Sequence, residues 1–257
     1  MIVDDVPYLV DCGYGVGRQL VDAKIGVATL RAIFITHHHS DHNADLGNLL
    51  VLAWASGLRT PVDAYGPPLV TDLVELALRY HAYDIAIRIP DEGRPDPRTL
   101  FAAHEIAAPG LVYQDERVRV EALLVPHPPV VPAYAFKFTS RDRVVVFSGD
   151  TAYSEALADF ARGADMLIHE VVLESALDRL LKLVPNATRL REHIVAGHTE
   201  AVDVGRIAAL ADVKHLVLSH FVPSYDPTLT DADWSDPVRL HYSGTLTLGK
   251  DLLALDA

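Results

Sequence analysis

Short apolar runs that lead to a histidine or an aspartate constrain this chain more than any other feature of its sequence. Leu30–Ile35 runs directly into the polar segment Thr36–His42, and three later runs lead to His127, Asp150 and His220. Runs of this length and composition are typical of buried β-strands. Polar groups at the ends of such strands are where α/β folds usually build their sites. The pattern therefore predicts an α/β protein with a polar site at the strand ends.

Segments with strand and helix patterns alternate along the rest of the chain. Amphipathic helices are predicted over Leu46–Ser56, Leu69–Tyr80 and Thr199–Leu210, where apolar residues recur at spacings of three and four. Residues 84–110 are less regular, and their prolines and glycine predict a loop over Asp91–Arg98. No linker or internal repeat interrupts the pattern. We therefore expect a single domain over residues 1–257, with two sheets and helices outside them.

The composition excludes several classes of protein. The chain has 257 residues, with 22 Lys and Arg against 35 Asp and Glu, and a formal net charge of −13. Because phosphates need a basic footprint, we expect no nucleic-acid partner. A single cysteine excludes a disulfide framework and a cysteine-based metal site. Neither a membrane-spanning run nor a signal peptide is apparent, so we expect a cytoplasmic protein with no membrane partner.

The strongest chemical signal is the group of His37, His39, Asp41 and His42. His37 and His39 alternate along an extended segment, so both can face one ion, while Asp41 and His42 turn toward a second point nearby. Imidazole and carboxylate ligands suit zinc, manganese and iron. A histidine-rich surface loop is the alternative interpretation. We disfavour it because the group directly follows a buried strand.

Three further residues complete a candidate metal centre. Alone, each of them would more often be a structural or solvent-facing group. With the motif, they give two ligand sets: His37, His39 and His127 for one ion, and Asp41, His42 and His220 for another. Asp150 would bridge the two ions, and a bridging carboxylate holds such a pair about 3.5–4 Å apart. The sequence thus predicts two divalent metal ions as cofactors.

These motifs resemble the metallo-β-lactamase superfamily. The resemblance rests on Leu9–Gly13, Thr36–His42, Ser148–Thr151 and Leu218–His220, which occur in the family's order over nearly the whole chain. It implies an α/β fold of the αββα four-layer sandwich type, with a dinuclear site, usually zinc, at one edge. The two ligand sets match the family's position by position. Asp11 is then expected to support a ligand backbone or histidine.

Within that superfamily, the chain most resembles the ribonuclease Z and arylsulfatase-like branch. His169-Glu170 resembles the branch's His-Glu-Ala-Thr segment, with valines in the last two places. Gly197-His198-Thr199 resembles its His-Ser-Thr segment, with threonine in place of serine. By this resemblance, His198 is the proton donor or oxyanion contact for the leaving group, and Glu170 orients it. An ordinary histidine at the start of a helix is the alternative for His198.

The chain departs from this branch in two ways. Members usually have another strand or hairpin before the Asp-Cys-Gly turn, whereas few residues precede Asp11 here. An N-terminal edge strand is therefore expected to be missing, which leaves a homodimer open as an assembly. Members that process transfer RNA carry a long basic insertion between the second and third metal motifs. Residues 65–127 hold no such basic run, so we expect no tRNA processing.

The expected function is two-metal hydrolysis of a small phosphodiester or sulfate ester, with a metal-activated hydroxide as the nucleophile. Asp41 would orient the attacking water while it ligates a metal, and aryl esters are the favoured small-molecule substrates. A lactonase, a phosphotriesterase or a β-lactamase-like amidase on the same site is the main alternative. A non-catalytic metal-binding protein and a redox member with a di-iron site are more remote.

Overall fold

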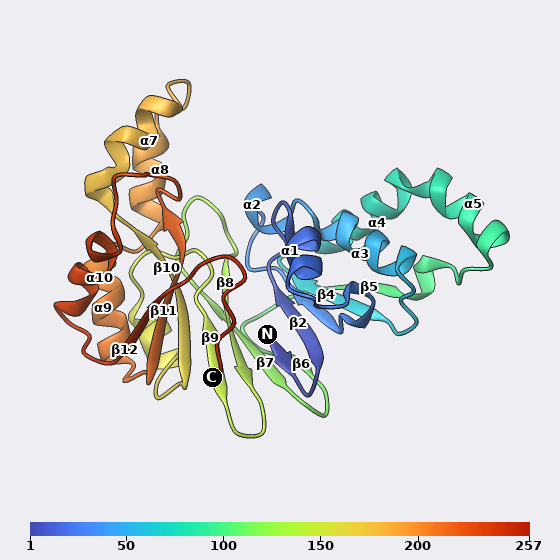
Figure 1. The fold of residues 1–257 in the computed structure, drawn as a ribbon, viewed down its shortest axis with the longest axis horizontal. Coiled ribbons are helices and arrows are strands. Elements are labelled where there is room, and N and C mark those ends of the chain that lie inside the picture. Colours follow the sequence, from blue (N-terminus) through green and yellow to red (C-terminus); the bar gives the residue numbers. More distant parts are fainter. The chain divides into compact units, whose positions relative to one another are not determined.

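The computed structural model describes residues 1–257. They form two compact units, Met1–Ala108 and Pro109–Ala257, and each unit is built on one β-sheet. Figure 1 shows the first unit in blue to teal and the second in green to red. No helix combines the length and the apolar composition that crossing a bilayer requires.

A five-stranded sheet forms the frame of the first unit, in the order β1-β2-β3-β4-β5. β1 and β2 are antiparallel, and all other neighbours are parallel. Every residue of β3 is buried, which explains why this strand appears in the sequence as a continuous apolar run. The strands are β1 (Ile2–Val3), β2 (Val6–Val10), β3 (Ala32–Phe34), β4 (Val62–Gly66) and β5 (Phe101–Glu105).

Helices of the first unit pack on this sheet through one apolar cluster. The buried residues of α3 recur at spacings of three and four, and Leu46, Leu50 and Trp54 belong to that cluster. Ile33, Val62 and Phe101 are among the residues that the sheet contributes to it. The helices are α1 (Val16–Asp22), α2 (Ser40–Asn43), α3 (Leu46–Ala55), α4 (Val70–Tyr80) and α5 (Ala82–Glu92), with short 3₁₀ turns at Val27–Thr29 and Pro97–Thr99.

Residues 84–110 are more regular than the sequence predicts. Helix α5 runs to Glu92, because Ile85 and Ile89 lie one turn apart and both pack against the core. Pro90 falls in the last turn, and the helix ends at Gly93, whose φ of 68° is the left-handed conformation that favours glycine. The prediction of a loop from Asp91 is therefore wrong in its first residues. Gly93 marks the helix end, and residues 93–96 form the irregular part that leads to the 3₁₀ turn at Pro97–Thr99.

A seven-stranded sheet forms the frame of the second unit, in the order β12-β11-β10-β9-β8-β7-β6. Neighbours from β6 to β9 are antiparallel, and those from β9 to β12 are parallel. The carboxyl ends of the parallel strands therefore lie at one edge. The strands are β6 (Gly110–Gln114), β7 (Arg119–Leu124), β8 (Tyr134–Thr139), β9 (Val144–Phe147), β10 (Met166–Val172), β11 (His215–Val222) and β12 (Thr245–Leu248).

Helices α6, α9 and α10 pack against this second sheet in an apolar cluster. Leu157 of α6, Ile207 of α9 and Val238 of α10 are all fully or almost fully buried in it. The pair α7 and α8 instead extends beyond the sheet, as Figure 1 shows in yellow and orange. The helices are α6 (Glu155–Phe160), α7 (Leu177–Leu183), α8 (Leu190–Gly197), α9 (Ala201–Leu210) and α10 (Asp231–Arg239), with a 3₁₀ turn at Glu174–Ala176.

Several boundaries in the second unit differ from the prediction. Strand β11 continues past its apolar run, so His220 lies within the strand and not after it. Helix α9 begins at Ala201 with Glu200 at its N-cap, because the hydroxyl of Thr199 donates to the Thr151 carbonyl instead of capping the helix. The sequence analysis does not predict α8 or α10, since polar residues and a proline dilute their apolar patterns.

Candidate metal centre

Four predicted ligands of the first unit lie between β3 and α3. His37 and His39 follow β3 directly, and Asp41 and His42 belong to the short helix α2. Nε2 of His37 lies 2.9 Å from Nδ1 of His39, and the ring centroids of His37 and His42 are 4.1 Å apart. Nε2 of His42 lies 3.6 Å from the Asp41 carboxylate. These side chains converge, as the ligands of a bound ion do.

Asp11 determines which ring nitrogen carries the proton in two of these histidines. Its carboxylate accepts Nδ1–H of His42 at 2.7 Å and the Thr36 hydroxyl at 2.9 Å. Because the Thr36 hydroxyl gives its one proton to Asp11, it accepts from Nδ1 of His37, 3.0 Å away. Both histidines are then left with an unprotonated Nε2, the form in which imidazole binds a metal. Thr36 is a supporting residue that the sequence analysis missed.

The turn that follows Asp11 holds the backbone of α2. The N–H of Cys12 donates to the His42 carbonyl at 2.6 Å. A Cβ on Gly13 would lie 1.9 Å from the carbonyl oxygen of Asp41, so only glycine permits this close approach. Cys12 itself is fully buried, and burial together with Asp45 and Asp11 raises the pKa of its thiol well above the usual range. The turn thus positions Asp41 and His42, and its thiol has no nucleophilic character.

A second group of predicted residues converges around Asp150 in the second unit. One carboxylate oxygen of Asp150 lies 4.0 Å from Nε2 of His127 and 4.0 Å from Nε2 of His198. The other oxygen lies 3.6 Å from Nδ1 of His220. Candidate ligand atoms of Asp150, His198 and His220 all lie within 4.8 Å of one another. A buried carboxylate with histidines beside both of its oxygens has the geometry that a bridging ligand needs.

His127 is held in the metal-binding tautomer by the end of α8. Its Nδ1 lies 2.7 Å from the Gly197 carbonyl, which can only accept, so Nδ1 carries the proton and Nε2 does not. Burial lowers the pKa of His127, which favours this neutral ring. A Cβ at position 197 would lie 2.9 Å from the same nitrogen. Gly197 is therefore a second supporting residue that the sequence analysis missed; its place directly before His198 is the only signal for it.

A β-bulge sets the direction of His220. In the pairing of β10 with β11, Glu170 lies opposite Ser219 and Val171 lies opposite Phe221, so His220 is the extra residue. Its φ of 44° is left-handed. A bulge bends the strand and redirects the side chain, which here stacks on His198 with ring centroids 5.6 Å apart. Nothing in the amino-acid pattern of β11 marks this bulge.

Glu170 lies buried beside His198. Its carboxylate accepts the N–H of Thr199 at 2.8 Å, and its other oxygen lies 3.2 Å from Nδ1 of His198. Burial raises the pKa of the Glu170 carboxyl, and the negative charge of Asp150 adds to that effect. Since Nδ1 of His198 faces Glu170, its Nε2 is directed toward Asp150. The structure thus brings together the two residues that the sequence analysis pairs.

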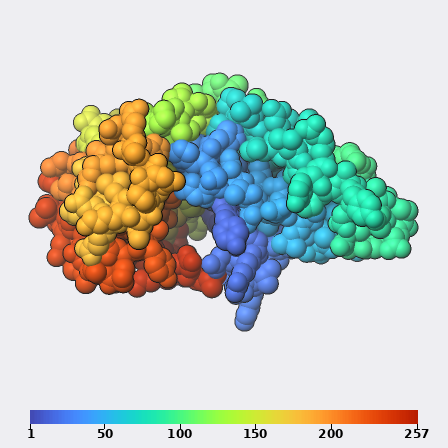
Figure 2. All heavy atoms as spheres, turned by 90° about the horizontal axis from the view of Figure 1, so that it is seen from above, coloured from blue at the N-terminus to red at the C-terminus, as the bar shows by residue number.

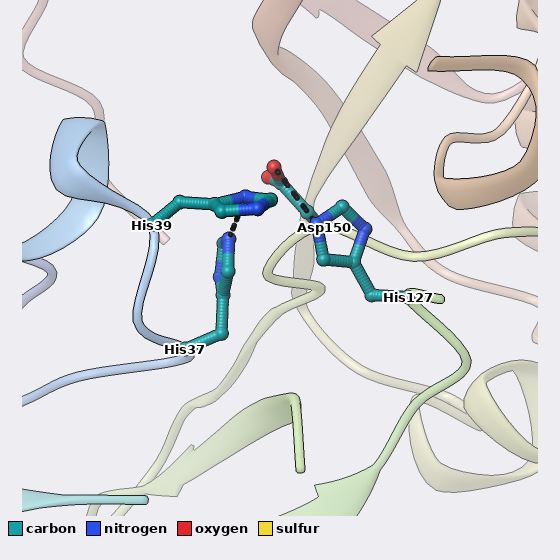
Figure 3. A group of neighbouring side chains, drawn as sticks. All are labelled: His37, His39, His127 and Asp150. Carbon is teal, nitrogen blue, oxygen red and sulfur yellow. Dashed lines mark hydrogen bonds and ion pairs between the residues drawn. The ribbon is translucent and has the colours of Figure 1, made fainter. Parts of the chain in front are cut away.

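The structure places every predicted ligand in one of two clusters, one in each unit. Figure 3 draws His37 and His39 from the first unit and His127 and Asp150 from the second, with the contact inside each pair dashed. His38, which lies between His37 and His39 in the motif, has its ring nitrogens 2.9 Å from the Pro68 carbonyl and 3.0 Å from the Asn43 amide. Its neighbours are thus outside the ligand cluster.

Comparisons with known proteins identify relatives along the whole chain. A family model described as Anti-Pycsar protein Apyc1 matches residues 1–201. Ribonuclease Z of Mycobacterium bovis (strain BCG / Pasteur 1173P2) is 30% identical over 248 residues, which cover 95% of this chain and 86% of the relative. Ribonuclease Z of Mycobacterium sp. (strain KMS) is 33% identical over 250 residues, with 95% and 84% covered.

Solved structures agree with the predicted fold class. The metallo-β-lactamase fold protein YhfI from Bacillus subtilis is similar with a TM-score of 0.68 and 23% identity, covering 96% of this chain and 86% of YhfI. The short form of human tRNase Z is similar with a TM-score of 0.69 and 21% identity, covering 100% and 90%. The prediction of an α/β protein with two sheets and a metallo-β-lactamase fold is confirmed.

The expectation that nucleic acid is excluded as a partner is wrong. It is overturned by the relatives at 30% and 33% identity, which are named ribonuclease Z. The physical reason is that a net charge of −13 is a sum over the whole chain, whereas phosphate binding depends on the local field. Bound cations and a few basic side chains near a site are enough to reverse the field there.

Proposed function

We propose a function from the premise that the chain belongs to the ribonuclease Z-like branch of the metallo-β-lactamase superfamily and to the family described as Anti-Pycsar protein Apyc1. The proposed function is hydrolysis of phosphodiester bonds with two divalent metal ions. The observation that carries the proposal is the donor set. Histidine nitrogens and carboxylates converge in each unit, and hydrogen bonds to Asp11 and Gly197 leave ligand nitrogens unprotonated. Such a set fits zinc, manganese or iron.

The proposed ligand sets are those that the sequence motifs define. His37, His39 and His127 would hold one ion, Asp41, His42 and His220 would hold the other, and Asp150 would be a ligand shared by the two. The chemistry that such ions supply is Lewis-acid activation of water and neutralisation of phosphate charge. Asp41 remains partly accessible, with 64% of its side chain exposed, so it can also hold the attacking water. Zinc is the first ion to test, followed by manganese.

His198 is the proposed proton donor to the leaving oxygen. Its Nδ1 faces the buried Glu170 carboxylate, which favours a proton on the ring and fixes its orientation. Its Nε2 is then the atom that can deliver a proton beside Asp150. Glu170 does not touch the substrate in this scheme and is a positioning residue. It is held in place by the N–H of Thr199.

The proposed substrate class is phosphodiesters, with RNA as the macromolecular substrate because the relatives are named ribonuclease Z. A bis-aryl phosphate is the minimal substrate, since it carries the reacting group and a good leaving group. Aryl sulfate, aryl phosphotriester, lactone and cephalosporin are the competing classes on the same centre. A preference for one of them would keep the fold and overturn the substrate class.

A panel of these chromogenic substrates tests the proposal on the protein reconstituted with zinc or manganese. We expect turnover of the bis-aryl phosphate to exceed that of every other member. His39→Ala should abolish it, whereas His38→Ala is the matched control, because His38 contacts Pro68 and Asn43. Equal losses in the two variants, or a lactone or lactam preference in the wild type, would contradict the proposal.

A further inference from the structure

Helices α7 and α8 form a hairpin whose two ends are attached to the candidate catalytic pair. The hairpin, residues 177–197, leaves strand β10 shortly after Glu170 and returns to the sheet at His198. At that return, the Gly197 carbonyl binds His127. Figure 2 shows the hairpin in gold and orange, exposed on the face of the second unit that is turned to the viewer. A ligand bound along the hairpin would therefore lead into His198.

The hairpin is basic in an acidic protein. It holds four basic and two acidic side chains, whereas the chain as a whole has a net charge of −13. The α4–α5 segment, residues 70–92, has the opposite balance, with five acidic and two basic side chains. Local excess of positive charge is the electrostatic footprint of phosphate binding. The basic residues of the hairpin are Arg179, Lys182, Arg189 and Arg191.

Two of these cations stabilise the hairpin itself. Arg179 binds the buried carboxylate of Asp226, with Nε 3.2 Å from the nearer oxygen, and so ties α7 to the loop after β11. Arg191 of α8 pairs with Asp178 of α7 and joins the two helices. Both contacts keep the hairpin in one orientation relative to His198. Each of these two guanidinium groups therefore already joins two elements of the fold, although both remain partly exposed.

The other two cations are available to a ligand. Lys182 is exposed and forms no ion pair. Arg189 pairs with Glu192 at 2.9 Å, but its side chain is 84% exposed and that of Glu192 is 67% exposed. An exposed pair of this kind contributes little to stability, so a phosphate can replace the glutamate at little cost. Lys182 and Arg189 are the two cations of the hairpin whose ion pairs join no other element of the fold.

A groove between the two helices adds an apolar surface to these charges. It has a volume of about 370 Å³, which falls in the range of small-molecule sites. Leu181, Val184 and Pro185 provide apolar side chains, and Arg191 and Glu192 lie at its α8 side. Apolar contact with an unstacked base, combined with cations on the backbone, is how single-stranded nucleic acid is bound without strict sequence preference.

We propose that the α7–α8 hairpin is a docking site for an RNA strand, which contacts Lys182 and Arg189 through its phosphates and leads into the centre at His198. This rests on the proposed phosphodiesterase function and assigns RNA binding to a specific surface. The site acts on affinity for RNA and leaves the chemistry at the metals untouched. A small diester is too short to contact the hairpin and the metal centre together, so its turnover does not depend on the hairpin charges.

The test measures binding and turnover separately on full-length protein. Binding of a fluorescein-labelled RNA hairpin with a single-stranded 3′ tail is followed by anisotropy in EDTA, so that no cleavage occurs. The double variant Lys182→Glu, Arg189→Glu is compared with the control Arg141→Glu, Arg162→Glu. The control pair is also exposed and makes the same change in charge, but lies near the amino-terminal ends of β9 and β10, at the sheet edge opposite Asp150.

We expect the hairpin variant to bind the RNA at least tenfold more weakly at about 100 mM salt, and the control to change affinity less than threefold. Loss of two phosphate contacts should also make the slope of log K against log salt shallower by about 1.4 to 1.8. The milder Lys182→Gln, Arg189→Gln variant should reproduce the shallower slope. Equal weakening in the control, or an unchanged slope in both hairpin variants, would overturn the inference.

Turnover of bis-aryl phosphate by the metal-loaded proteins distinguishes the two proposals. The hairpin variants should turn it over at the wild-type rate. If wild-type protein fails to turn it over while the RNA affinities differ as expected, the phosphodiesterase proposal fails and the docking site stands. If turnover is normal and RNA affinity does not depend on the hairpin charges, the docking site fails alone.

Discussion

Replacement of Asp11 by asparagine should weaken metal binding although Asp11 is not a ligand. The carboxylate accepts three hydrogen bonds, from the N–H of Thr36, the Thr36 hydroxyl and Nδ1 of His42. An amide keeps one accepting oxygen and replaces the other with a donor group. When the oxygen stays on the Thr36 N–H, the amide nitrogen faces the Nδ1–H of His42 and the Thr36 hydroxyl. Two donors cannot pair, so the local network must change.

The simplest change is a tautomer switch in His42. Its proton moves from Nδ1 to Nε2, and the nitrogen that binds the metal then carries a hydrogen that must be displaced. The Thr36 hydroxyl loses its acceptor as well, which releases His37 in the same way. Replacing such supporting groups typically costs 10–100-fold in metal affinity, about 1.4–2.7 kcal/mol. We expect Asp11→Asn to bind its more weakly held ion at least tenfold less tightly.

The assay is zinc titration against a chromophoric chelator, together with nitrogen NMR shifts that report the His42 tautomer. Asp45→Asn is the matched control, because Asp45 accepts the N–H of Gly15 at 2.6 Å and the amide of Asn48 at 3.1 Å and no histidine. Wild-type zinc affinity in Asp11→Asn would refute the reasoning. So would an equal loss in Asp45→Asn, since that would show a general effect of charge.

Three further predictions concern other parts of the chain. His198→Ala should keep the metal content and lower turnover by about 10²–10⁴-fold, the usual contribution of a general acid; a loss of metal would instead identify His198 as a ligand. Burial raises the pKa of the Cys12 thiol, so above about pH 8.5 the thiol ionises in the unfolded chain while it stays protonated in the folded one. The free energy of unfolding should therefore fall with pH more steeply than in Cys12→Ala, by about 1.4 kcal/mol per pH unit. Urea unfolding between about pH 9.5 and 11 measures this difference, and parallel curves would contradict it. If residues 1–257 are a single domain, calorimetry should give one transition with equal calorimetric and van't Hoff enthalpies, and two resolved transitions would show separate domains.

The sequence predicts best those parts of the molecule that local pattern controls. Buried strands such as β3 and amphipathic helices such as α3 and α4 are found within one or two residues, because each buries a regular apolar face. The candidate ligands are found for a related reason. Each histidine or aspartate at the end of an apolar strand would alone more often be a structural group, but together with His37–His42 they complete two candidate ligand sets.

The remaining features depend on contacts between residues that are distant in the chain. The bulge at His220 results from pairing with β10, and the tautomer of His127 depends on a carbonyl 70 residues away. The net charge of the whole chain does not reveal that basic residues outnumber acidic ones in the α7–α8 hairpin, because most acidic residues lie elsewhere. Composition could therefore not decide the question of a nucleic-acid partner, for which the distribution of charge matters.

The metal content of the purified and reconstituted protein tests the central claim most directly. Elemental analysis should find about two equivalents of zinc or manganese in the wild type. His127→Ala and Asp150→Ala should each bind at least one equivalent less and lose phosphodiester turnover. Less than one equivalent in the reconstituted wild type, or two equivalents and full activity in both variants, would contradict the dinuclear centre.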